Sequence, residues 1–86
     1  MQREFDEGQY HVVVRARPEY RPTAPGQIID GYRTSATITR IDGTAVYQSY
    51  LNYQINEEGI YLQQDGAFTE IEKAARKAIE DGFPDA

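Results

Sequence analysis

His11 is the one side chain in this chain whose ordinary pKa lies close to neutral pH, so it is the first residue to consider for acid–base catalysis. A catalytic histidine needs a nucleophile or a carboxylate placed to relay its proton, and no Ser, Cys or Asp is placed by the sequence to do so. Glu57, Glu58 and Asp65 stand near predicted turns, where carboxylates are common for turn geometry and solubility. The sequence therefore predicts a protein that is not an enzyme, with His11 as an exposed strand residue.

Composition excludes several further kinds of chemistry. The chain has no cysteine and a single histidine, which rules out a disulfide framework and a zinc cluster built from these ligands. It also has no glycine-rich phosphate-binding loop, so we expect no cofactor and no metal. The first residues lack the apolar stretch of a signal peptide, and no segment approaches the roughly 20 apolar residues of a membrane span. We expect a soluble, cytoplasmic protein.

A second group of polar residues could bind rather than catalyse, and its position depends on the predicted strands. Residues 9–17 form a β-branched run that predicts a strand, which Pro18 is expected to close. Residues 18–30 contain three prolines and predict a long loop, either a contact surface or a flexible connector. Residues 1–8 are expected to be a flexible N-terminus.

Asp42-Gly43 is the strongest hairpin signal in the chain, because this dipeptide favours a two-residue type I′ turn. It predicts that residues 31–41 pair with residues 44–55, with Ile38 opposite Tyr47. One face of this hairpin is then apolar and the other polar, as expected for an antiparallel sheet with one solvated face. A short strand over residues 60–63 and a turn at Asp65-Gly66 are expected to follow.

The C-terminal segment carries the signals of an amphipathic helix. Thr69 and Glu72 have the spacing of a capping box, and Gly82 and Pro84 provide a stop. Apolar residues recur at intervals of three and four, which places them on one face with Phe68 and Phe83 at its ends. The residues of this stripe are Ile71, Ala74, Ala75, Ala78 and Ile79.

These elements predict an α+β fold: an antiparallel meander of three or four strands with one C-terminal helix packed on one face. The length of 86 residues suits a single domain, residues 1–86, with one modest core. Residues 10, 12, 14 and 16 are expected to face the helix, and residues 11, 13, 15 and 17 the opposite side.

Two family resemblances follow from these residues. Gly66–Ala74, followed by Ala78–Gly82, resembles the ending of small bacterial β-β-β-α domains of unknown function, which implies this fold and a bacterial or phage setting but transfers no site. Three strands followed by a helix also resemble the C-terminal part of a double-stranded-RNA-binding domain. That family's first helix is missing here, and Glu70 and Glu72 replace its basic helix start, so we do not expect its function.

The polar sheet face is the predicted binding surface, joined by Tyr20 and Arg21 from the proline-rich segment. Tyr and Arg are favoured at protein interfaces, and Lys is depleted there. We expect a non-catalytic interaction module or small regulator that binds a protein partner or itself, for example as a homodimer. The residues expected on the face are Arg15, Arg17, Arg33, Gln48, Tyr50 and Asn52.

Single-stranded nucleic-acid binding on the same face is the alternative function, since basic and aromatic sheet faces can hold phosphates and stack bases. The charge of the chain disfavours it. Residues 1–43 hold six Arg, no Lys and six acids, whereas residues 44–86 carry the whole net charge of −5.

Overall fold

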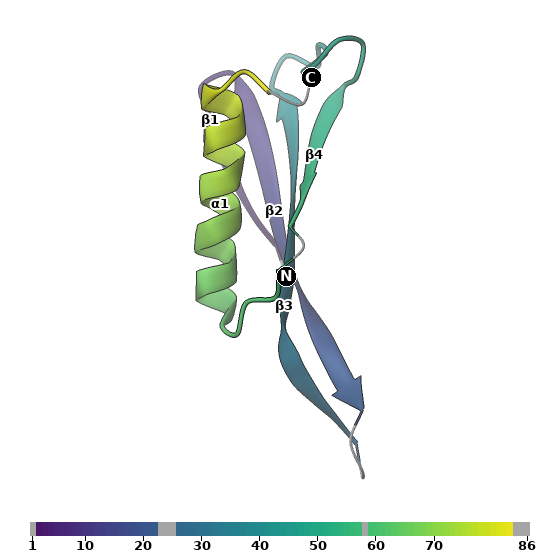
Figure 1. Ribbon diagram of the computed structural model, residues 1–86. Coiled ribbons are helices and arrows are strands. Elements are labelled where there is room, and N and C mark those ends of the chain that lie inside the picture. The colour runs from purple at the N-terminus through teal and green to yellow at the C-terminus, as the bar shows by residue number, and fades with distance from the viewer. Residues whose placement is uncertain (1, 23–25, 58, 84–86) are drawn as a thin grey trace.

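The computed structural model describes residues 2–22, 26–57 and 59–83. Four antiparallel strands form one sheet in the order β1-β2-β3-β4, and the helix α1 packs against one of its faces (Figure 1). This arrangement confirms the predicted α+β fold. The elements are β1 (Gln2–Glu7), β2 (Tyr10–Pro22), β3 (Gln27–Arg40), β4 (Asn52–Asn56) and α1 (Gln64–Glu80).

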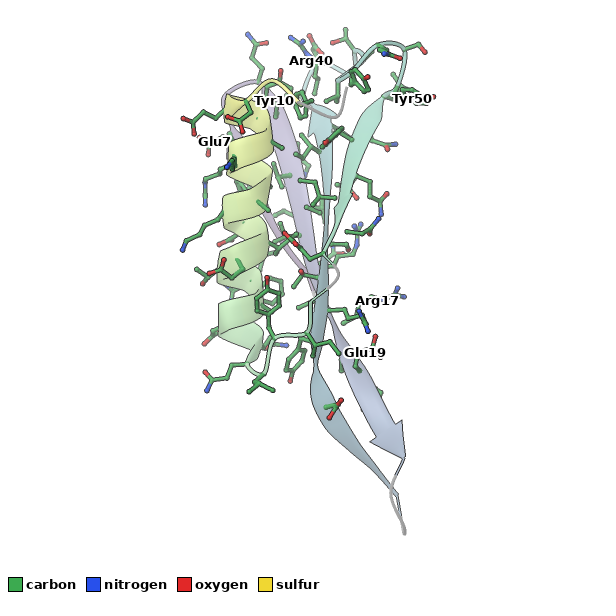
Figure 2. The ribbon with its side chains drawn as sticks, viewed as in Figure 1. Glu7, Tyr10, Arg17, Glu19, Arg40 and Tyr50 are labelled. Atoms are coloured by element: carbon green, nitrogen blue, oxygen red, sulfur yellow. The ribbon has the colours of Figure 1, made fainter. Side chains whose placement is uncertain are left out.

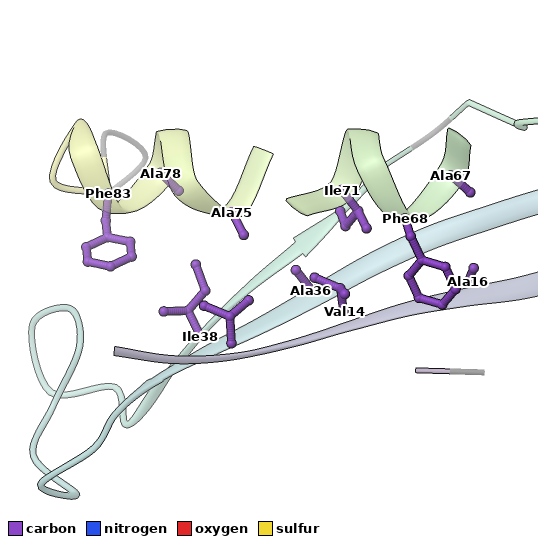
Figure 3. Packing of buried hydrophobic residues seen from close by; sticks show 11 residues of the cluster. Val14, Ala16, Ala36, Ile38, Ala67, Phe68, Ile71, Ala75, Ala78 and Phe83 are labelled. Atoms are coloured by element: carbon purple, nitrogen blue, oxygen red, sulfur yellow. The ribbon is translucent and has the colours of Figure 1, made fainter. Parts of the chain in front are cut away.

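The hydrophobic core lies between α1 and the even-numbered side chains of β2 and β3 (Figure 3). The alternation of a strand sends these side chains to one face, and α1 covers them with a stripe rich in alanine that lets the helix lie close. Ile38, Ile71, Val12 and Val14 are its largest fully buried side chains, and burial of each contributes about 1.5–3 kcal/mol. The full set of buried apolar residues is Val12, Val14, Ala16, Ala36, Ile38, Ala67, Phe68, Ile71, Ala75, Ala78 and Phe83.

The helix begins earlier than the sequence indicates. α1 starts at Gln64, and Thr69 lies inside it, where its hydroxyl donates to the Asp65 carbonyl at 2.9 Å. The predicted capping box and the turn at Asp65-Gly66 are therefore wrong. Ala67 and Phe68 are both buried against the sheet, and this tertiary burial outweighs the cost of about 1 kcal/mol for Gly66 in a helix.

The C-terminal end of α1 agrees with the sequence. Gly82 adopts a φ of 73°, its N–H donates to the Ile79 carbonyl at 3.2 Å, and the Phe83 N–H donates to the Ala78 carbonyl at 2.8 Å. This pair of bonds is a Schellman motif, which reverses the chain and buries the Phe83 ring beside Tyr10 and Tyr53. The predicted stop at Gly82 is confirmed, while Pro84 lies outside the described residues.

Residues 2–7 form the edge strand β1, so the expectation of a flexible N-terminus is wrong. β1 pairs with β2 through a tight turn at Gly8, where φ is 60°. The guanidinium of Arg76 in α1 lies 4.4 Å from the Phe5 ring centre and donates to Glu7 at 3.2 Å. These contacts join residues nearly 70 positions apart, and local sequence gives no sign of them.

The proline-rich segment is not a long loop. β2 continues through Pro18 to Pro22 and pairs with β3, so the two strands project beyond α1 as a ribbon (Figure 1) and the molecule measures 49 × 21 × 20 Å. Pro18 is opposite Tyr32, whose N–H donates to the Tyr61 carbonyl at 2.7 Å and therefore points away from β2. In such a pair neither residue uses its N–H toward the other strand, so β2 tolerates a proline at this position.

The Asp42-Gly43 turn exists but does not join two strands directly. The Asp42 carboxylate accepts hydrogen bonds from the Thr44 hydroxyl and N–H, at 2.6 and 3.0 Å, which lower its pKa and hold a local side-chain turn. The chain then turns again before β4, so Ile38 lies opposite Tyr53 rather than Tyr47. The predicted register is wrong by six residues, but because the shift is even, the residues that do form β4, Asn52–Asn56, keep their predicted alternation between the two faces.

The expected strand over residues 60–63 is reduced to an isolated bridge between Tyr61 and Tyr32. This bridge brings Ile60 against Gly31 of β3. A Cβ atom at Gly31 would overlap the Ile60 Cγ2 methyl and come within 3.0 Å of the Tyr61 carbonyl oxygen.

Gly31→Ala should therefore lower the free energy of unfolding by about 1–3 kcal/mol, since residues 60–61 would have to move. Gly59→Ala is the matched control, because its Cβ would meet open space and should change stability by less than about 0.5 kcal/mol. Urea denaturation of both variants checks this, and equal stabilities would contradict the close approach at Gly31.

Thr34→Val should raise stability by about 1 kcal/mol, because the Thr34 side chain is buried and its hydroxyl has no hydrogen-bond partner among the described residues. Thr37→Val is the control, since the Thr37 hydroxyl accepts a hydrogen bond from Arg15. Thermal denaturation would show the difference, and a loss of stability in Thr34→Val would contradict it.

Candidate functional site

The face of the sheet opposite α1 is almost entirely polar, and we call it the open face. It consists of the residues whose register and alternation place them away from the helix. β1 contributes acids, β2 and β3 contribute arginines and hydroxyls, and β4 contributes side-chain amides. The open face comprises Gln2, Glu4, Asp6, His11, Val13, Arg15, Arg17, Glu19, Arg33, Ser35, Thr37, Thr39, Asn52, Gln54 and Asn56.

A broad hollow of about 830 Å³ lies in the open face, and we call it the arginine hollow. Arg15 and Arg17 enter it from β2 and Arg33 from β3, while β4 supplies Gln54 and Asn56. Figure 2 shows Arg17 projecting on the side of the sheet away from α1. The remaining residues of its lining are Pro18, Glu19, Thr34, Ser35, Thr37 and Glu57.

The three arginines differ in their contacts. Arg15 is half-buried and donates from Nη1 to the Thr37 hydroxyl at 3.1 Å. Arg33 forms a hydrogen-bonded ion pair with Glu19. Arg17 lies directly opposite Arg33 in the register and is exposed, and no carboxylate in the described part of the chain pairs with it. The lining of the hollow therefore holds three arginines and two carboxylates, Glu19 and Glu57, on a chain whose net charge is −5.

Arg15, Arg17 and Arg33 lie together as the sequence predicts, but Gln48 and Tyr50 do not join them. Both belong to the connection between β3 and β4, where Tyr50 stacks on Tyr47 with ring centres 6.4 Å apart and Gln48 has a φ of 51°. Figure 2 places Tyr50 at the end of the sheet remote from Arg17. Their placement on the sheet face is wrong because β4 begins after them, at Asn52.

The three other predicted residues also lie outside the hollow. Asn52 is on the open face opposite Thr39, at the end near Tyr50. Tyr20 is 54% exposed on the projecting ribbon, opposite Ile29. Arg21 belongs to β2, and its side chain lies outside the described residues.

Sequence reasoning missed the residues that complete the hollow. Gln54 and Asn56 of β4 reach it because β4 pairs with β3 six residues later than the Asp42-Gly43 turn implies. Ser35 and Thr37 of β3 also line the hollow, and the sequence prediction of the binding surface includes neither. Alternation of β4 alone would have placed Gln54 and Asn56 with Asn52, which is the signal that could have found them.

The end of the open face away from the ribbon is acidic. His11 Nδ1 lies 2.7 Å from Asp6 Oδ1, and its Nε2 lies 3.2 Å from Glu4 Oε1. The hydrogen bond to Asp6, followed by the one to Glu4, raises the pKa of His11 above its ordinary value of 6.5. The protonated ring then bridges two carboxylates of β1 to β2, which is a structural role and agrees with an exposed strand histidine.

Except for Tyr20 on the projecting ribbon, the aromatic residues of the four strands lie on the other face. Phe5, Tyr10, Tyr32 and Tyr53 pack against the core under α1, and no described open-face position carries an aromatic ring. The site is therefore built from arginines, amides, hydroxyls and the carboxylates of Glu19 and Glu57. This corrects the expectation of a mixed arginine–tyrosine surface.

Two kinds of feature are absent from the parts of the chain that the structure describes. Residues 2–22, 26–57 and 59–83 contain no group of three or more His, Cys, Asp or Glu placed to hold a metal ion. Over the same ranges no helix has the length and apolar character needed to cross a membrane. No protein-family model, curated protein or solved structure matches this chain.

The bridge at His11 predicts a pH-dependent stability. The pKa of His11 is raised in the folded state. The protonated His11 therefore stabilises the fold fully below pH 6.5, and this stabilisation is lost as the pH rises through the pKa of His11 in the folded protein. Denaturation midpoints measured from about pH 5.5 to about pH 8.5 should fall with increasing pH, and His11→Gln should flatten this decline.

His11 is the only histidine of the chain, so this variant isolates its contribution. Asp6→Asn should weaken the pH dependence as well, because it removes the closer carboxylate. A decline that is equally steep in wild type and His11→Gln would show that the bridge does not stabilise β1.

Proposed function

We propose that the protein is a non-catalytic interaction module that binds a partner protein on the open face, at the arginine hollow. One observation carries the proposal: Arg15, Arg17 and Arg33 converge from two strands on a face that α1 leaves uncovered. Arginine is enriched at protein interfaces, where its planar guanidinium donates several hydrogen bonds in a fixed geometry.

The rest of the hollow supports a peptide-like ligand. Gln54 and Asn56 each carry both a donor and an acceptor, and Ser35 and Thr37 add hydroxyls. Such groups satisfy the N–H and C=O groups of a partner backbone, whose burial without hydrogen bonds would cost free energy. A polar interface of this kind binds reversibly, which suits a small regulator.

Single-strand nucleic-acid binding receives less support. That function relies on aromatic rings that stack bases beside a basic groove. In this protein the rings of Tyr10, Tyr32 and Tyr53 lie under α1, and Glu19 and Glu57 line the hollow with negative charge. The open face therefore provides arginines that could contact phosphates but no aromatic rings on which bases could stack.

Site-specific cross-linking tests the proposed surface whatever the identity of the partner. A photoreactive phenylalanine analogue at Gln54, in the hollow, should form covalent adducts in native cells at several times the yield of the same analogue at Lys77. Lys77 is the matched control because it is an exposed residue of α1, which packs on the opposite face. Adduct masses distinguish a second copy of the chain from another protein.

Arg15→Ala combined with Arg17→Ala should reduce the Gln54 adducts while the Lys77 background stays unchanged. Equal adduct yields from the two positions would exclude the open face as the binding surface. A solution mass measured over a concentration series would then show whether any adduct with a second copy reflects stable self-association.

A further inference from the structure

Arg17 and Arg33 form a pair of like charges directly opposite each other on neighbouring strands. They are partners in the β2–β3 register, and both residues are exposed. Like charges in this position destabilise a sheet, by roughly 0.2–1 kcal/mol on the scale of cross-strand pairs. Fold stability alone therefore does not account for two arginines here.

One internal carboxylate offsets part of this repulsion. Glu19, two residues after Arg17 on the same face of β2, pairs with the Arg33 guanidinium. Arg17 has no such partner in the described ranges, and Arg15 lies two residues before it on the same face. Arg15 and Arg17 thus present cations at an interval of about 6.6 Å, the repeat of an extended chain.

We propose that the arginine hollow binds an extended acidic segment of a partner protein, with carboxylates at alternate positions contacting Arg15 and Arg17. This inference rests on the proposed function and specifies the chemistry of the partner. An extended segment shows every second side chain on one face, so its spacing matches that of the two arginines. The bonds formed are charge-assisted and can be bidentate, which gives both strength and geometric selectivity.

The carboxylates in the hollow favour a protein segment over a polyphosphate chain. Glu19 and Glu57 lie in its lining, and a nucleic-acid strand with a charge on every nucleotide would meet both. A peptide with uncharged residues between its carboxylates avoids this repulsion. Its backbone also reaches the amides of Gln54 and Asn56.

Glu19 acts in this arrangement as an internal competitor. By holding Arg33, it stabilises the empty face and reduces the positive charge available to a ligand. Substitution of Glu19 should lower the free energy of unfolding of the free protein and raise its affinity for the acidic segment. Opposite effects on stability and affinity are expected of a side chain that substitutes for a ligand.

The test uses three synthetic ten-residue probes with the full chain: alternating Glu-Ser, alternating Gln-Ser, and a block peptide, Glu-Glu-Ser-Ser-Glu-Glu-Ser-Ser-Glu-Ser, which has the same number of Glu but never two of them at alternate positions. Fluorescence anisotropy at low salt should show the alternating Glu-Ser peptide binding about tenfold more tightly than the block peptide, a difference of about 1.4 kcal/mol. The Gln-Ser peptide should not bind. Affinity should fall with added salt.

Arg17→Gln should weaken binding of the alternating Glu-Ser peptide about tenfold or more while raising the denaturation midpoint of the free protein, because it removes the like-charge pair. Lys77→Gln is the matched control: it makes the same change in net charge on the exposed side of α1 and should alter affinity less than twofold. Glu19→Gln should strengthen binding, whereas Glu80→Gln on α1 should not.

Three results would overturn the proposal: equal affinity for the alternating and block peptides, equal effects of Arg17→Gln and Lys77→Gln, or a destabilised or unfolded Arg17→Gln protein. A single-stranded oligonucleotide that binds more tightly than the alternating Glu-Ser peptide, with the same dependence on Arg17, would instead identify a nucleic-acid site. Cross-linking at Gln54 would still report a protein partner if only the acidic specificity is wrong, so the two proposals fail separately.

Discussion

The packing of α1 on the even-numbered side chains of β2 and β3 is the constraint on which the rest of the structure depends. The helix uses small residues, Ala67, Ala75 and Ala78, and therefore approaches the sheet closely around Ile71. Because strand side chains alternate, the burial of Val12, Val14 and Ala16 commits their neighbours to the opposite face. A shift of one residue in β2 would bury Arg15 and Arg17 under the helix, and the same shift in β3 would bury Arg33, at a prohibitive cost for unpaired charges.

This constraint explains how β1 and the projecting ribbon remain attached to so small a core. β1 adds Phe5 and Glu7 to the helix side of the sheet, where Arg76 contacts both. The ribbon extends past α1 and has no helix above it, so backbone pairing between β2 and β3 is its main support (Figure 1). Its base is held by the bridge between Tyr32 and Tyr61, which connects the ribbon to the segment leading into α1.

Periodicity in the sequence was enough to predict which residues of β2 and β3 face the helix, and the fold class followed. Tertiary contacts, together with one local side-chain hydrogen bond, decided what was missed. Burial of Phe68 against the sheet extends α1 toward its N-terminus. Arg76 of α1 donates a hydrogen bond to Glu7 and so holds β1, at the other end of the chain, against the helix. The Asp42 side chain bonds Thr44, which lengthens the connection before β4. Local patterns contain propensities and spacing but not these energies. Alternation can therefore place Arg15, Arg17 and Arg33 on one face, and Gln54 and Asn56 with them, but it cannot give the register that brings β4 beside the arginines.

Like charges lie close together at both ends of the open face, and the two ends differ in how these charges are compensated. At one end, carboxylates of β1 lie beside each other and His11 bridges them, so the chain supplies its own counter-charge. At the other end, Arg17 and Arg33 lie side by side. Glu19 forms an ion pair with Arg33, and no carboxylate of the described residues pairs with Arg17. A chain with acids in excess could have placed a second carboxylate beside Arg17 at little cost. The lack of an internal partner for Arg17 among the described residues supports the proposed binding surface, because a fully neutralised cation would have to lose its internal partner before it could bind a ligand.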